Sequence, residues 1–248
     1  MEIKLTPENI EDHVEKIGVT VAPAIEHKME KAHFLNLYSE LSDKYPNLYE
    51  SMVQSPNEFQ IRKKFIFPAK GEIDGTTLAV PPVGPVFIFP RKVGMLEAET
   101  DIGDSEPIII ECIKIFRKHF PLKKLLRIGQ INEYVFTLGT EQTGIDFISK
   151  RFTKIVMPPD GEIKLRVNRP IDDYNRIIDL SPIIKTQVKP PDQTSEIKAY
   201  GLKVKVDFNN RDMSVELDSD KTRSIIQASK IFNETTLYEF LNGNLGGS

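Results

Sequence analysis

Several residue types are scarce in this sequence, and each scarcity excludes a class of protein. The 248 residues include one cysteine, Cys112, so no disulfide can form within the chain. No apolar run approaches the ~18 residues that a membrane-spanning helix needs. Acidic and basic residues nearly balance, with a net charge of −3. This balance gives no bulk attraction to nucleic acid or to an anionic membrane, although it leaves room for a local basic patch.

The same scarcities indicate where the protein resides. The N-terminal residues lack the basic start and apolar stretch of a secretory signal. Cys112 lies in the apolar run 108–113, which favours a reduced thiol buried in the core over a reactive one. We therefore expect a cytoplasmic protein with no membrane attachment.

The remaining pattern predicts an N-terminal helical extension followed by a first α+β repeat over residues 18–122. In the extension, residues 1–17, Thr6 and Pro7 suit a helix start, and Val14 and Ile17 follow at helical spacing. Alternation, turn residues and caps then predict a strand at 19–22, a helix around 34–41, strands at 59–67, 76–80, 86–89 and 93–98, and a helix at 105–119.

A second α+β repeat is predicted over residues 123–242, followed by a flexible tail at 243–248. Its expected elements are a strand at 125–138, a helix at 140–152, strands at 163–167, 177–184, 202–208 and 213–217, and a helix ending at 232. Pro182 is expected to break the second of these strands, and residues 209–212 to form a hairpin turn. Asp218 or Ser219 would cap the last helix.

Runs of strands that end in a helix, without βαβ alternation, favour antiparallel sheets with helices on one face. The fold class is thus α+β, with the order strand, helix, four strands, helix occurring twice. This order resembles the saddle of the TATA-box-binding protein and related helix-grip folds, a likeness that carries no function. The helices at 105–119 and 219–232 should then be equivalent, with Phe116 and Phe232 both buried against strands.

Three segments occur in order along most of the chain: Leu41 to Tyr49, Leu126 to Asn132, and Ile231 to Leu237. Together they resemble a sporadically distributed, functionally uncharacterised family of prokaryotic proteins of about this length. The second segment is similar to its central strand, and the third to its terminal helix and following turn. Residues 69–100 depart from the family, because they lack the tryptophans that are common there. The resemblance implies no activity.

Catalytic and metal-binding patterns are absent from the sequence. It contains no Gly-x-Ser-x-Gly, Walker-type or Gly-x-Gly-x-x-Gly segment, and its four histidines are not at ligand spacing. An acidic run over residues 97–111 could hold a divalent cation, but a solvated acidic rim explains it better. We therefore expect no cofactor, no metal and no catalytic residue.

A basic run is the most suggestive local feature. Six cations occur without an intervening acid, as binding to a phosphate backbone requires: Lys114, Arg117, Lys118, Lys123, Lys124 and Arg127. The first three also suit a helix C-terminus, where cations are stabilised by the helix dipole, and no aromatic residues interleave as a stacking platform. A solvated basic face is the simpler interpretation, and contact with an acidic protein partner is a third.

Three hypotheses for the function follow. The leading one is a non-enzymatic binding or protein-interaction scaffold, whose sheet face or groove receives a protein partner and which is compatible with a homodimer. The second is a nucleic-acid-binding module that uses the basic run 114–127. The third is an enzyme whose site is assembled from residues distant in sequence.

Overall fold

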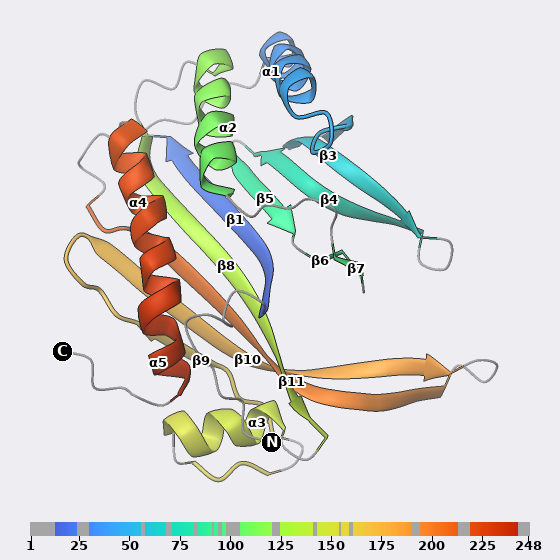
Figure 1. Cartoon of the computed structure of the whole chain (residues 1–248), viewed down its shortest axis with the longest axis vertical. Helices are drawn as coiled ribbons and strands as arrows, with labels where there is room; N and C mark the ends of the chain where they lie inside the picture. The colour runs from blue at the N-terminus through green and yellow to red at the C-terminus, as the bar shows by residue number, and fades with distance from the viewer. Residues whose placement is uncertain are drawn as a thin grey trace.

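A computed structural model of the chain is shown in Figure 1. The structure describes residues 13–23, 30–55, 58–67, 71–81, 84–90, 92–93, 96–97, 105–120, 125–140, 143–153, 155–158, 161–189, 194–212 and 219–242. None of the helices in this described part is long and apolar enough to cross a bilayer.

The fold is α+β and is organised around one nine-stranded sheet in which all neighbouring strands are antiparallel. From edge to edge, the strand order is β2-β3-β4-β5-β1-β8-β11-β10-β9. The strands are β1 (Val14–Pro23), β2 (Ser51–Ser55), β3 (Glu58–Phe67), β4 (Gly71–Val80), β5 (Val86–Pro90), β8 (Leu125–Gly139), β9 (Leu165–Asn168), β10 (Tyr174–Lys189) and β11 (Thr194–Asn210). The short strands β6 (Lys92–Val93) and β7 (Leu96–Glu97) pair separately. Both predicted repeats therefore contribute to the same sheet.

The helical segments lie between these strands and after the last of them. They are α1 (Lys31–Lys44), α2 (Ser105–His119), α3 (Gly144–Ile148) with the π-helical turn η2 (Ser149–Thr153), and α4 (Ser219–Phe232), which continues through η3 (Asn233–Leu237) into α5 (Tyr238–Leu241). The helix predicted at 105–119 is confirmed with both of its ends. Its first turn carries Glu106 and its last turn Arg117, Lys118 and His119, charges that complement the helix dipole.

Helices α1, α2 and α4 pack on one face of the sheet, in front of it in Figure 1. The ring of Phe34 on α1 lies 4.2 Å from that of Phe59 on β3. The ring of Phe116 on α2 meets that of Phe87 on β5 edge-on, with 6.4 Å between the ring centroids. These aromatic side chains lie between the helices and the sheet and belong to one hydrophobic core.

On α4, the corresponding residue is Phe232, whose ring centroid lies 5.9 Å from that of Phe208 on β11. Phe116 and Phe232 are both buried, with 1% and 4% of their surfaces exposed. The prediction that both would lie against the sheet is confirmed.

One sequence prediction fails at the start of β1. Val14 and Ile17 are spaced as on a helix, but both belong to this strand. A β-bulge between Val14 and Lys16 inserts one extra residue, so the two side chains point into the same core although they are three residues apart. The bulged strand therefore buries two apolar residues three positions apart, the spacing that is typical of a helix. The rest of the predicted extension, residues 1–12, lies outside the described residues.

Two predicted interruptions in the second half are also wrong. Asn209 and Asn210 end β11 instead of forming a turn, because their side chains find partners within the sheet: Asn209 donates to Asp207, and Asn210 accepts from the backbone N–H of Ile128. Pro182 lies within β10. Its position is tolerated because pairing with β9 has already ended at Leu180, which leaves that edge of β10 free.

The helix predicted at 140–152 begins later, at Gly144. Thr143 caps it, since its hydroxyl accepts a hydrogen bond from the backbone N–H of Asp146. The predicted strand at 213–217 and the tail at 243–248 lie outside the described residues.

Candidate functional site

The structure places the four described cations of the predicted basic run on two sides of the sheet. Lys114, Arg117 and Lys118 lie on the last turns of α2, on the helix-covered side of the sheet. Arg127 alternates with the buried Ile128 on β8 and therefore points to the opposite side. Lys123 and Lys124 lie outside the described residues.

Three of the four described cations of the run have acidic neighbours. The ammonium of Lys118 lies 2.7 Å from the carboxylate of Glu40, and that of Lys114 lies 3.7 Å from Glu111. The guanidinium of Arg127 lies 3.7 Å from Asp207. These acids reduce the positive potential that a phosphate backbone would meet.

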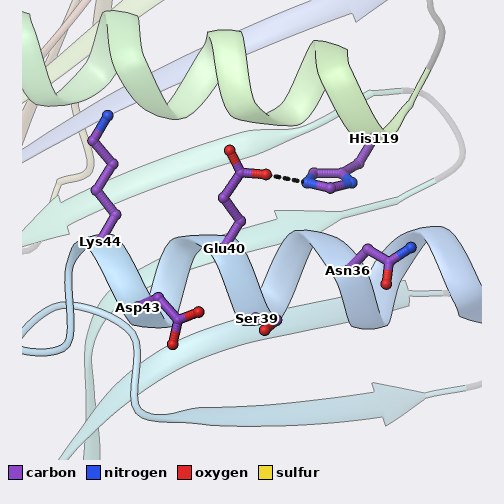
Figure 2. A pocket seen from close by; sticks show the side chains of 6 residues that line it. All are labelled: Asn36, Ser39, Glu40, Asp43, Lys44 and His119. Carbon is purple, nitrogen blue, oxygen red and sulfur yellow. Dashed lines mark hydrogen bonds and ion pairs between the residues drawn. The ribbon is translucent and has the colours of Figure 1, made fainter.

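Glu40 also belongs to an open cleft of about 500 Å³ between α1 and α2 (Figure 2). Its carboxylate lies 2.6 Å from Nε2 of His119, the last residue of α2. Hydrogen bonds from Lys118 and then from His119 lower the pKa of Glu40 below its usual 4.5. The cleft is lined by Asn36, Ser39, Glu40, Asp43, Lys44 and His119. Sequence reasoning missed this pair because its members are 79 residues apart and carry no local pattern.

A metal centre finds no support in the described part of the chain, where no group of three or more histidine, cysteine or acidic residues is placed to hold an ion. Cys112 is buried, as predicted. Burial raises the pKa of its thiol to about 12, and its sulfur lies 3.7 Å from the hydroxyl of the buried Tyr49. A thiol in this state is a core residue, since the reactive form is the thiolate.

The described helices leave one face of the sheet uncovered (Figure 1). On β5, Phe87 and Phe89 are buried beneath the helices, so the alternating Val86 and Ile88 point to the other face. The register continues this face across the central strands, because Gly18 on β1 pairs with both Ile88 and Ile131.

We call five of the partly exposed apolar side chains on this face the sheet-face patch: Val86, Ile88, Ile131, Val135 and Ile177. They come from β5, β8 and β10, and Gly18 places no side chain between Ile88 and Ile131. The alternation in each strand is visible in the sequence. The order of the strands, which brings Ile88 and Ile131 together across Gly18, is not.

Charged residues lie within and around the sheet-face patch and are paired with one another. Glu133 lies between Ile131 and Val135 on β8, and Asp207 on β11 is the register partner of both Ile131 and Ile177. The ammonium of Lys203 lies 3.0 Å from Glu133, and the guanidinium of Arg166 lies 3.2 Å from Asp179. With the pair of Arg127 and Asp207, they leave this face without a strong charge of one sign.

Neither models of protein families nor the curated proteins give a match to this chain.

Proposed function

We propose that this protein is a non-enzymatic interaction scaffold, built from two α+β repeats, whose helix-free sheet face binds a protein partner. The sheet-face patch is the observation that carries this proposal. Protein interfaces place apolar side chains at their centre and polar ones at the rim. Ile88 and Ile131 supply such a centre across Gly18, and the ion-paired Glu133 and Asp207 beside Ile131 supply polar groups at its border.

The strand order supports the two-repeat arrangement. Outward from the central neighbours β1 and β8, one half runs β5-β4-β3-β2 and the other β11-β10-β9. The strand beside each central strand contacts the helix that closes its half, through Phe87 and Phe116 in one case and Phe208 and Phe232 in the other.

Two properties favour a protein over a nucleic acid as the partner. The sheet-face patch has no aromatic side chain on which bases could stack. The described cations nearest to a phosphate-binding role, Lys118 and Arg127, lie beside carboxylates and on opposite sides of the sheet. A nucleic-acid module would instead use Lys123 and Lys124, and their reversal to Glu would weaken low-salt binding to DNA or RNA.

An enzyme assembled from distant residues would have its site at Glu40 and His119, which meet in the cleft between α1 and α2. This carboxylate is already neutralised by Lys118, and the cleft is open to water. Such an arrangement favours an ion pair that joins two helices over an acid–base pair poised for chemistry.

Photo-crosslinking in cells tests the proposal. A photoreactive residue at position 131, in the sheet-face patch, should capture one protein that the same residue at position 231 does not. Ile231 is the matched control, because it is 60% exposed on α4, on the other side of the sheet. The captured protein is then purified, and its affinity is measured by calorimetry.

Ile131→Lys should weaken this complex by at least about tenfold, since a charge replaces an apolar contact at the interface centre. Ile231→Lys should leave the affinity unchanged, and both variants should unfold at a temperature close to that of the wild type. The proposal would be overturned if Ile131→Lys left the affinity unchanged. Capture of a nucleic acid in place of a protein would also overturn it.

A further inference from the structure

Strand β2 forms one edge of the nine-stranded sheet and, among the described residues, pairs only with β3. The outer side of an edge strand presents backbone N–H and C=O groups that can pair with another strand. Four of the five residues of β2 are exposed, so side chains from the part of the chain that the structure describes leave this edge accessible.

The sequence of β2 lacks the devices that usually protect such an edge. Its five residues, Ser51 to Ser55, include no charged residue and no proline. Met52 and Val53, at its centre, are 36% and 37% exposed. The opposite edge, β9, differs, because its exposed Arg166 places a charge there.

The strand is also complementary to itself. In an antiparallel pair centred on Val53, this residue opposes its own copy, Met52 opposes Gln54, and Ser51 opposes Ser55. No two like charges face each other in this register.

The same register is consistent with the two faces of the sheet. Met52 pairs with Ile61, which is buried beneath the helices, so Met52 and Gln54 point to the helix side. Val53 points to the helix-free side. Two copies related by a two-fold axis would thus continue both faces, with the helices of each copy on the same side of the sheet.

We propose that β2 is a dimerisation edge: two copies of this chain pair through antiparallel β2 strands centred on Val53 and join their sheets into one. The contact is isologous, as in most symmetric dimers. It is independent of the sheet-face patch, which lies on β5, β8 and β10. A five-residue strand pair is a small interface, so the dimer should be weak and concentration-dependent.

Crosslinking through an introduced cysteine tests the register. Because Cys112 is buried, Val53→Cys provides the accessible thiol in the described part of the chain. A short bis-maleimide should convert this variant to a covalent dimer, since the two thiols would face each other across the axis. Val156→Cys, at a residue that is 95% exposed outside the sheet, is the control and should remain monomeric.

Sedimentation equilibrium tests the interface without a crosslinker, from about 1 μM to about 1 mM, a range that spans weak association. The wild type and Val156→Lys should dimerise equally, whereas Val53→Lys, which sets two cations opposite each other, should raise the dissociation constant by more than about tenfold. A wild type that stays monomeric throughout, a dimer that Val53→Lys does not weaken, or no selective crosslink at position 53 would each overturn the proposal.

Discussion

The carboxylate of Glu40, on α1, lies 2.6 Å from the imidazole Nε2 of His119 at the end of α2. With Lys118, 2.7 Å from the same carboxylate oxygen, this contact joins two helices that are far apart in the sequence. The pair lies at the surface, so its energetic effect is modest and depends on pH.

Replacing Glu40 with Gln should destabilise the fold near pH 7 by at most about 1 kcal/mol, the range of exposed ion pairs. The pKa of Glu40 is lowered in the folded state, so its contribution is present above the usual value of 4.5 and is lost as the pH falls through the lowered value. Urea unfolding at pH 7 and at several acidic pH values should therefore show the two proteins converging as the pH falls.

Glu162→Gln is the control for this measurement. Glu162 pairs with Lys164, two residues away, and joins no separate elements, so its removal should change stability little. A stability difference for Glu40→Gln that persists at low pH would show that the side chain acts through packing instead of charge.

Truncation of Phe116 to Ala should lower the free energy of unfolding by about 3–5 kcal/mol, as for other large buried side chains. The ring loses contacts with Phe87 and with Phe120, whose centroid is 4.6 Å away. Phe232→Ala should have a similar effect if α2 and α4 are equivalent. Chemical denaturation measures both, with the exposed Leu35→Ala expected to change stability by less than about 0.5 kcal/mol. A small effect at only one phenylalanine would contradict the equivalence.

Gly144→Ala should destabilise the protein by roughly 1–3 kcal/mol, although alanine favours helices by up to about 1 kcal/mol. An added Cβ would lie 2.5 Å from the carbonyl oxygen of Gly201 and 2.7 Å from Cβ of Pro182, so α3 would have to move off the sheet. Thermal unfolding checks this expectation. Gly18→Ala is the matched control, because its Cβ would lie 3.6 Å from the nearest atom. Equal melting temperatures for the two variants would contradict the close approach of α3.

Cys112 should resist thiol reagents in the native protein. Its thiol is buried, with a pKa of about 12, so little thiolate forms at neutral pH and the reagent has no access. The rate of reaction with an aromatic disulfide reagent should follow the unfolding of the protein and rise steeply in denaturant. Rapid modification without denaturant would place the residue outside the core.

The helix at 105–119 could be predicted because its signals are local. Glu106 and Pro107 mark its first turn, and Ile109, Cys112 and Phe116 recur at helical spacing. The start of β1 could not be predicted, since its bulge depends on pairing with Tyr134 and Glu133 of β8. The spacing of apolar residues therefore identifies a strand only where pairing with its neighbour introduces no bulge.

Candidate sites were less predictable than elements. The basic run is contiguous in the sequence, but sheet topology separates Arg127 from Lys118 and places an acid beside each. The sheet-face patch shows the reverse case, because Ile88 and Ile131 become neighbours across Gly18 only when β1 lies between β5 and β8. A run of charges can be read from the sequence, whereas the residues that share a surface depend on the order of the strands in the sheet.

The central position of β1 also bears on how the protein forms during synthesis. It is the first described strand to leave the ribosome, yet its two partner strands are made much later. Gly18 pairs with Ile88 on one edge of β1 and with Ile131 on the other, so both edges are paired only after β5 and then β8 have been synthesised. Such non-local pairing slows folding. Until β8 is made, the nascent chain carries an open strand edge, and this interval is when the protein is most exposed to pairing with other chains.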